Sequence, residues 1–195
     1  MEKLNTNNNI ILGSKSPRRI ELMKMMGIPF KVLKLNTNED YPKSLSPIEV
    51  AIYLSKKKAN NYLIKSKEIL ICADTVVYSG KNLLEKPNSI NEAKKMLELI
   101  SNSRHFVVTG VTIKTKNKMT SFYDRSIVYF KKLTKKEINY YIKNYNPFDK
   151  AGGYGIQEWI GLIGINKISG SFYNVMGLPT HRIYEKLNKI NVFKN

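Results

Sequence analysis

The stretch NNIILGSKSPRRIELMKMMG (residues 8–27) decides the fold, because a short apolar strand runs directly into a helix within it. After the apolar run comes the polar loop SKS. Ser16 then has the character of a helix N-cap, and Pro17 suits the first helical position. Leu22 and Met23 follow on an apolar face. A strand, a loop and a helix in this order predict an α/β protein.

The first turn of this helix contains two arginines, Arg18 and Arg19. Free backbone N–H groups make a helix N-terminus partly positive, so cations there cost up to about 1 kcal/mol. The arrangement becomes favourable if an anion binds there, together with the hydroxyl groups of Ser14 and Ser16. We therefore expect a phosphate site. A surface SPRR tetrapeptide without function, or a kinase-type site, is the alternative interpretation.

The rest of the chain alternates strand and helix patterns, with one long hairpin and no internal repeat. We expect a mixed sheet in an α/β or α+β domain, and a single domain over residues 1–195 with polar tails at about 1–8 and 189–195. The expected elements are a strand at 29–35, a helix from Pro47 to about Lys65, a strand from 68 that turns through Ser79-Gly80 into a partner, a helix at 89–100 with the capping-box pair Ser89 and Glu92, a hairpin at 104–132, a helix at 135–145, a strand pair around 168–171 and a last helix from 178–179 to Leu187.

Length and cysteine content bound the class of protein. A chain of 195 residues with 42% hydrophobic residues is large enough to bury its own core. The single cysteine, Cys72, has no partner for an intramolecular disulfide, which suits a reducing compartment. We see no signal-peptide stretch and no window of roughly 18 apolar residues, so we expect a cytoplasmic, soluble protein without a membrane partner.

The net charge of +18 raises the question of nucleic-acid binding. Only five of the 33 cationic residues are arginines, and the lysines are scattered along the whole chain. A binding surface for nucleic acid needs a stripe or patch of cations, with aromatic side chains between them for single strands. We therefore expect no dedicated nucleic-acid partner.

Asp74 interrupts the apolar run CADTVV (residues 72–77). A buried carboxylate without a partner costs several kcal/mol, so Asp74 must lie at a strand end, meet a cation or hold a metal. An aspartate that caps a loop is the structural alternative. Two lysines also differ in position from the other lysines of the chain: Lys58 precedes Ala59 on a helix, and Lys86 precedes Pro87 at a strand end. Solvated surface lysines are the alternative interpretation for both.

Three glycines in DKAGGYGIQ (residues 149–157) allow the backbone to approach a ligand closely, although a flexible loop gives the same pattern. His105 and His181 lie far apart in the sequence, and both are far from Cys72. We interpret both histidines as structural rather than as zinc ligands.

Six motifs in this order, SxSPRR, ADTVV, KP…EA…ML, HxVxTGV, DKAGgYGIQ and GSxxNVxGLP, resemble the Maf family of nucleotide pyrophosphatases from about Ile10 to Leu187. The resemblance implies a Maf/Ham1 (inosine triphosphate pyrophosphatase-like) fold, with two lobes around a central cleft and commonly a homodimer. It also implies hydrolysis of nucleoside triphosphates to the monophosphate and pyrophosphate, with Mg²⁺ or Mn²⁺ as cofactor.

The resemblance also assigns roles to residues of this chain. It implies that Asp74 is the catalytic base. It also implies that the triphosphate is held by four residues: Ser14, Arg19, Lys58 and Lys86. We count the two lysines among the catalytic residues. Glu39 is the implied metal contact, although TNEDYP also aligns on Asp40. The branch of the family is indicated by Arg18, Thr75 and Gln157, which match the dTTP/UTP type. The chain departs from the family pattern at Glu85, Glu158 and Asn146.

We therefore predict a pyrophosphatase for dTTP and UTP, with CTP or modified pyrimidine nucleotides as further candidate substrates. The competing hypothesis is a catalytically weak basic protein on the same fold that binds nucleic acid or serves a regulatory role. The intact set of Asp74, Lys58 and Lys86 favours the enzyme.

Overall fold

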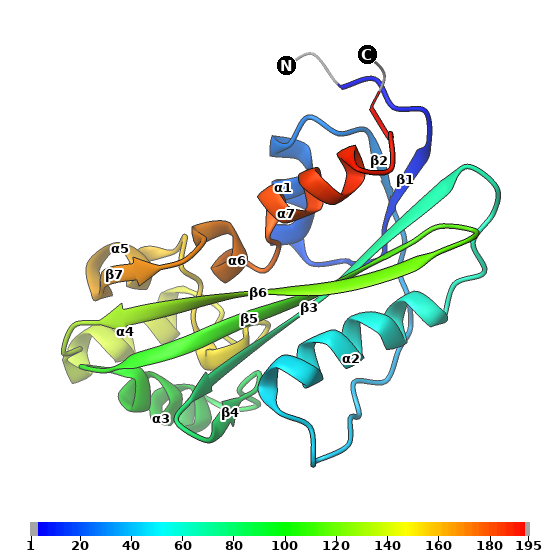
Figure 1. Cartoon of the computed structure of the whole chain (residues 1–195). Coiled ribbons are helices and arrows are strands. Elements are labelled where there is room, and N and C mark those ends of the chain that lie inside the picture. The colour runs from blue at the N-terminus through cyan, green and yellow to red at the C-terminus, as the bar shows by residue number, and fades with distance from the viewer. Residues whose placement is uncertain (1–3, 194–195) are drawn as a thin grey trace. The chain divides into compact units, whose positions relative to one another are not determined.

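The computed structural model describes residues 4–193 (Figure 1). Its strands are β1 (Asn9–Leu12), β2 (Phe30–Val32), β3 (Glu68–Ser79), β4 (Asn82–Leu84), β5 (Arg104–Lys114), β6 (Met119–Phe130) and β7 (Ile165–Ser169). Its helices are α1 (Pro17–Met25), α2 (Pro47–Asn60), α3 (Ile90–Ile100), α4 (Lys135–Asn144), the 3₁₀ turn η1 (Ala151–Gly153), α5 (Trp159–Gly164), α6 (Phe172–Met176) and α7 (Thr180–Asn188).

The strands form one seven-stranded mixed sheet. Along the sheet the order is β2-β1-β3-β5-β6-β7, and β4 pairs with β3 beside this path. β1 is parallel to both β2 and β3, whereas β4 and β7 are antiparallel to their partners. The predicted α/β class with a mixed sheet is confirmed.

Contacts divide the chain into two compact units, which we describe separately. Among the described residues, unit 1 comprises 4–74, 109–124 and 177–193, and unit 2 comprises 75–108 and 125–176. The long strands β3, β5 and β6 each contribute residues to both units. The expectations of a single domain over 1–195 and of two lobes around a cleft stay predictions.

Unit 1 is built from βα connections. Helix α1 connects β1 to its parallel neighbour β2, and helix α2 connects β2 to β3, which lies on the other side of β1 and is also parallel to it. The pairings Leu12 with Val32 and Leu12 with Ile71 align the three strands. A cluster of buried side chains from β1, β3 and α2 closes this part of the core: Ile11, Leu70, Cys72 and Ala59.

Helix α2 packs closely on strand β5 at Gly110. A Cβ atom at this position would lie 2.3 Å from the backbone carbonyl group of Ala51, so only glycine fits. The nearby hydroxyl groups of Ser55, Thr112 and Ser121 are linked by contacts of 2.8 Å, which satisfy their polar atoms inside the core. This close packing positions the face of α2 that also bears Lys58.

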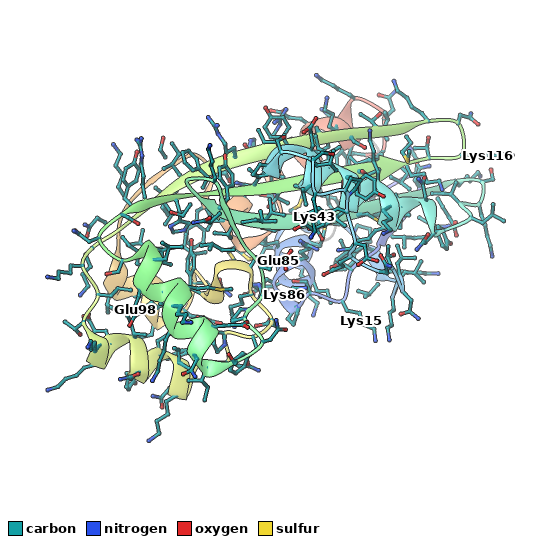
Figure 2. The ribbon with its side chains drawn as sticks, turned by 90° about the horizontal axis from the view of Figure 1, so that it is seen from below. Lys15, Lys43, Glu85, Lys86, Glu98 and Lys116 are labelled. Carbon is teal, nitrogen blue, oxygen red and sulfur yellow. The ribbon has the colours of Figure 1, made fainter. Side chains whose placement is uncertain are left out.

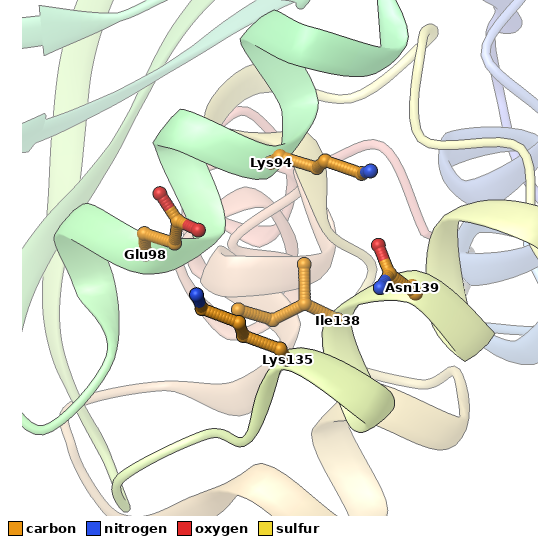
Figure 3. A pocket seen from close by; sticks show the side chains of 5 residues that line it. All are labelled: Lys94, Glu98, Lys135, Ile138 and Asn139. Carbon is orange, nitrogen blue, oxygen red and sulfur yellow. The ribbon is translucent and has the colours of Figure 1, made fainter.

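Unit 2 contains helices α3 and α4, which pack against each other, and an aromatic cluster around Tyr154. The hydroxyl group of Tyr154 lies 2.7 Å from His105 Nε2, and the Phe130 ring meets the Tyr154 ring edge to face. Figure 3 shows a shallow hollow between α3 and α4 whose lining combines both charges: Lys94, Glu98, Lys135, Ile138 and Asn139.

The predicted N-cap of α3 is confirmed, with one difference. Ser89 Oγ accepts a hydrogen bond from the backbone N–H of Glu92, as the spacing predicted. The Glu92 carboxylate, however, accepts from the N–H of Asn88 rather than from that of Ser89. The pair therefore closes the turn one residue earlier than a capping box does.

Helix α2 was predicted to continue to about Lys65, which is wrong, because it ends at Asn60. Lys114 Nζ donates to the carbonyl oxygens of Ala59 and Tyr62, at 3.0 and 2.8 Å. A cation therefore satisfies carbonyl groups at the end of the helix, where another helical turn would otherwise be needed.

Of the strand pair predicted around residues 168–171, the first strand is confirmed as β7, whereas a second strand after it is wrong, because α6 follows. β7 ends at Ser169 and pairs with β6, and Gly170 then adopts a φ of +117°. Ser171 Oγ accepts a hydrogen bond from the N–H of Asn174 at the start of the chain segment that forms α6. The short helices α5 and α6 were not predicted, since five or six residues carry too little periodicity. β2 is shorter than the expected strand at 29–35.

The described parts of the two predicted tails are paired with each other. Thr6 forms a bridge with Phe193, and the N–H of Asn7 donates to the carbonyl oxygen of Val192 at 2.8 Å. Residues 1–3 and 194–195 of these tails lie outside the described part of the chain. Between residues 4 and 193, none of the helices has the length and apolar character that crossing a membrane requires.

Candidate active site

Most of the predicted site residues belong to unit 1, where β1 ends between β2 and β3. The N–H of Gly13 still donates to Ile71 on β3, and the N–H of Leu33 donates to Leu12, at 2.8 and 2.9 Å. Beyond these hydrogen bonds the segments that follow β1 and β2 leave the sheet, whereas β3 continues. Loops at the carboxyl ends of parallel strands are the usual place for ligands in α/β sheets.

Asp74 lies within β3, is 8% exposed and meets a cation. Its carboxylate forms an ion pair with Lys58 Nζ, and the same ammonium group lies 3.0 Å from Glu39 Oε1. Lys58 comes from α2, and Glu39 comes from the loop that follows β2. Three segments therefore bring two carboxylates to one nearly buried ammonium group, and the requirement that Asp74 meet a cation is fulfilled.

Arg19 ties α1 to the strand that bears Asp74. Its Nη1 donates to the carbonyl oxygen of Ala73 at 2.7 Å, and its Nε donates to that of Gly177 at 2.8 Å. Gly177 has a φ of +113°, which favours glycine at this position. The guanidinium group thus faces the loop after β1 and also binds two backbone oxygens. The sequence did not indicate this second, structural role.

The hydroxyl group of Ser14 organises this loop. Ser14 Oγ accepts from the N–H of Ser16 at 3.2 Å and from Arg19 Nη1 at 3.4 Å. Ser16 occupies the N-cap position of α1 as predicted, but its side chain makes no capping hydrogen bond. The serine that supports the helix entry is therefore Ser14.

The charges of this cluster act on one another. Burial lowers the pKa of Arg19, the carboxylates of Asp74 and Glu39 oppose that shift, and the neighbouring Arg18 adds to it. Arg18, Arg19, Glu39 and Asp74 therefore lie within electrostatic range in unit 1. This is the combination that the sequence predicted for a phosphate site next to a catalytic carboxylate.

The carboxylates of Glu39 and Asp74, which meet at Lys58 Nζ, allow us to ask whether the residues present fit the predicted divalent metal. Mg²⁺ is typically held in proteins by one or two carboxylates together with substrate phosphates and water. Glu39 and Asp74 supply such a pair and fit that requirement. No group of three or more Asp, Glu, His or Cys side chains suited to a metal occurs among residues 4–193.

The structure distinguishes Glu39 from Asp40, the other residue on which the motif aligns. Asp40 directs its carboxylate to the side-chain amide of Asn38, and its carbonyl oxygen accepts from Lys57 Nζ at 2.8 Å. Only Glu39 of the two is recorded in contact with Lys58. Glu39 is therefore the acidic residue that accompanies Asp74.

Three predicted site residues, Thr75, Lys86 and Gln157, belong to unit 2. Lys86 is exposed just after β4, next to Glu85 (Figure 2). The carbonyl oxygen of Glu85 accepts from the N–H of Gly152 at 3.2 Å. The segment with Lys86 therefore lies against the glycine-rich loop, so this loop is anchored rather than flexible at that point.

Gln157 lies at the third position of a β-turn. The N–H of Glu158 donates to the carbonyl oxygen of Gly155 at 3.1 Å and closes this turn, which leaves the Gln157 side chain exposed. Thr75 is partly buried and follows Asp74 directly in β3. Unit 2 thus brings together the segments of Lys86 and Gln157, and Thr75 is adjacent to Asp74 in the chain.

Lysines are distributed as the sequence predicted. In the view of Figure 2, nitrogen-tipped side chains project from helices, strands and loops alike, with Lys15, Lys43 and Lys116 among those labelled.

Sequence reasoning missed the residues that support the site. It singled out neither the carbonyl groups of Ala73 and Gly177 nor the side chain of Tyr141, whose hydroxyl oxygen accepts from the N–H of Gly155 at 3.0 Å. Gly177 stands in the GLP segment of the last motif, which was the available signal. Tyr141 is one of twelve tyrosines, and nothing local distinguishes it.

The chain is similar to proteins of known family. The model of the family described as Maf-like protein matches residues 9–190. A dTTP/UTP pyrophosphatase of Cytophaga hutchinsonii is 49% identical over 94% of this chain and 85% of its own length. One of Parabacteroides distasonis is 46% identical over 91% and 94%. Among solved structures, the Staphylococcus aureus Ham1 protein aligns with a TM-score of 0.44 and 14% identity, over 63% of this chain and 72% of its own. By the family match and by this identity to its relatives, the chain belongs to the Maf family.

Proposed function

We propose that this protein hydrolyses nucleoside triphosphates to the monophosphate and pyrophosphate, with dTTP and UTP as its best substrates. The observation that carries the proposal is the contact of Lys58 with both Asp74 and Glu39, beside the arginines of α1. The names of the relatives at 46% and 49% identity support the pyrimidine substrates.

The proposed chemistry follows from the charge of the substrate. A triphosphate carries about four negative charges, and these repel an attacking water molecule until cations neutralise the oxygens. Arg18, Arg19, Lys58 and Lys86 supply that neutralisation. Asp74 accepts a proton from the attacking water, and Lys58 holds its carboxylate in one position.

We propose that Glu39 and Asp74 also hold a divalent cation, Mg²⁺ or Mn²⁺. When bound, such an ion stabilises the negative charge of the phosphate oxygens. Lys58 Nζ contacts both of these carboxylates and so compensates their charge at a place where Asp74 is nearly buried.

We propose that Gln157 reads the base. The pairing edge of uracil and thymine presents acceptor, donor and acceptor, and an amide side chain meets an adjacent donor–acceptor pair. A site built to form hydrogen bonds rejects ligands that leave its polar groups unpaired. Cytosine exchanges the donor and the acceptor, but the amide can turn over. CTP is therefore an intermediate substrate, and purine nucleotides are poor ones.

Further parts of the proposal concern the setting of the enzyme. We propose that it acts in the cytoplasm and as a homodimer. A basic protein on this fold with weak catalysis, which binds nucleic acid or regulates another process, is the competing function. The acid–base cluster at Asp74 favours the enzyme.

Pyrophosphate release from dTTP, UTP, CTP, ATP and GTP, measured in the presence and absence of Mg²⁺, tests the proposal. We expect the order dTTP and UTP, then CTP, then the purines. The same panel on Glu98→Gln, in the hollow between α3 and α4, provides a control. Preference for GTP or a methylated guanine nucleotide would assign the chain to another branch. Absence of pyrophosphate from all substrates, with retained binding of nucleic acid, would favour the competing function.

A further inference from the structure

One buried hydroxyl group ties both ends of the turn that bears Gln157. The turn begins at Gly155 and ends at Glu158. Tyr141 accepts from the N–H of Gly155 at 3.0 Å through its hydroxyl oxygen, and it donates the hydroxyl proton to Glu158 Oε2. The first and last residues of the turn, Gly155 and Glu158, therefore both contact the hydroxyl oxygen of Tyr141 in α4.

This hydroxyl group lies in the core of unit 2. Tyr141 has no exposed surface, and Tyr145 stacks on its ring with the centroids 5.4 Å apart. Burial and the contact with Glu158 raise the pKa of Tyr141, so its proton remains on the oxygen at physiological pH. The donor role toward Glu158 is therefore constant.

A second anchor holds the Glu158 carboxylate. Lys150 Nζ lies 3.0 Å from Glu158 Oε1 and 2.9 Å from Asp149 Oδ1, and it also donates to the carbonyl oxygen of Asn146. The Lys150 side chain is only 7% exposed. Both oxygens of Glu158 thus have a defined partner, one from α4 and one from the start of the glycine-rich loop.

The carboxylate of Glu158 folds back onto its own turn. A Cβ atom at Gly155 would lie 2.7 Å from the carboxyl carbon of Glu158, so this arrangement needs glycine at Gly155. The carbonyl oxygen of Glu158 also accepts from the N–H groups of Gly161 and Leu162, at 2.9 and 3.2 Å. Glu158 therefore connects the turn, through its side chain and its backbone, to α4 and α5.

We propose that Tyr141 and Glu158 are positioning residues that hold the turn from which the Gln157 amide reaches pyrimidine bases. The inference rests on the proposed function, which it deepens, and it concerns two residues that do not touch substrate themselves. Gln157 is exposed, so the turn, rather than side-chain packing, fixes the place from which its side chain extends. Loosening the turn lets the amide occupy several positions relative to the base, and discrimination between bases falls.

Tyr141→Phe is the most specific test, since it removes one oxygen and leaves the ring. The adjacent Tyr140→Phe is the matched control, because Tyr140 lies on the same helix with its ring against Trp159 at 4.6 Å. We expect Tyr141→Phe to lower the ratio of kcat/KM for UTP over ATP by about tenfold, a loss of ~1.4 kcal/mol of discrimination. Tyr140→Phe should keep the wild-type ratio.

Three further measurements separate positioning from general destabilisation. In a Gln157→Ala background, Tyr141→Phe should have no additional effect on the ratio, because the group it positions is absent. Glu158→Gln, which retains an oxygen for Tyr141, should keep more of the ratio than Glu158→Ala. Trp159, the single tryptophan, follows Glu158 directly, and its quenching by acrylamide should rise in Tyr141→Phe but not in Tyr140→Phe.

A folded Tyr141→Phe protein with the wild-type UTP-to-ATP ratio would overturn the inference. So would an equal loss in Tyr140→Phe, or a full further loss in the Gln157→Ala background. If the wild-type chain releases no pyrophosphate, the proposed function fails, and the ratio of UTP to ATP affinities from titration calorimetry replaces kcat/KM. An affinity ratio that Tyr141→Phe leaves unchanged then overturns the inference in the same way.

Discussion

The ammonium group of Lys58, on α2, forms an ion pair with the carboxylate of Asp74, in β3. Both side chains are nearly buried, at 13% and 11% exposed, so each charge depends on the other for compensation. Glu39, half exposed, approaches the same ammonium group from the loop after β2. The pair therefore couples the packing of α2 on the sheet to the chemistry that we propose for Asp74.

Asp74→Asn should retain the fold and nucleotide binding, and should lower kcat at least about a hundredfold, because the amide cannot accept the proton of the attacking water. Circular dichroism, calorimetric titration and pyrophosphate release measure the three properties. Glu98→Gln, which removes a carboxylate from the hollow of Figure 3, is the control. Near-wild-type turnover of folded Asp74→Asn would exclude this role.

Arg19→Ala should weaken binding of a triphosphate much more than binding of the bare nucleoside, because the proposed ligand contact is to phosphate alone. It should also lower the free energy of unfolding by about 2 kcal/mol or more, since the carbonyl groups of Ala73 and Gly177 lose charged donors.

Arg19→Lys is the matched variant, since it keeps the charge but cannot bind both carbonyl groups with one planar fork. Isothermal titration with UTP and uridine, and urea unfolding of the three proteins, give the comparison. Equal losses of affinity for the two ligands would place Arg19 away from the phosphates.

Glu39→Gln should raise the Mg²⁺ concentration for half-maximal activity by about tenfold, because one of the two proposed carboxylate ligands becomes neutral. Asp40→Asn should leave that concentration nearly unchanged, because the Asp40 carboxylate faces Asn38. Titration of the chelated enzymes with Mg²⁺ and Mn²⁺ provides the values. A larger effect of Asp40→Asn would move the metal contact to that residue.

Gln157→Ala should flatten the order of substrates, with UTP and dTTP losing more kcat/KM than ATP and GTP, while the melting temperature changes little. The side chain is exposed, so its removal takes little from the core. Measuring kcat/KM for the five nucleotides in both proteins provides the test. A uniform loss for all five would show that Gln157 does not read the base.

His105 should make the protein less stable in mild acid. Burial lowers the pKa of His105 to about 4, below its ordinary value near 6.5, because the imidazolium form is poorly solvated there. Between these two values the unfolded chain binds a proton that the folded chain does not, so stability falls as the pH falls from about 6.5 to 4. At pH 4.5 this amounts to about 2–3 kcal/mol.

Urea unfolding of wild type and His105→Gln at pH 7 and pH 4.5 measures this contribution. The glutamine amide can still meet Tyr154, and it does not titrate. The wild type should lose about 2–3 kcal/mol more than the variant between the two pH values. Equal losses would mean that another group causes the acid sensitivity.

Local signals in the sequence were sufficient for most elements. Ser16-Pro17, the Ser89–Glu92 spacing and the turn after Lys114 correctly predicted where α1, α3 and the long hairpin lie. Such signals work because caps and turns depend on neighbouring residues. Helix α2 ended earlier than predicted, because Lys114, distant in sequence, binds its last carbonyl groups.

By itself the sequence determined the α/β class, the family resemblance and the candidate residues, because a charge within an apolar strand and two arginines at a helix start require partners wherever they lie. Only the tertiary structure decided which partners they meet. In the structure, Glu39 rather than Asp40 contacts Lys58, which also pairs with Asp74. Arg19 donates to the carbonyl oxygens of Ala73 and Gly177, and Tyr141 contacts the turn that bears Gln157. These contacts join segments far apart in the chain, and their geometry depends on how helices pack on the sheet, which no local pattern of residues encodes.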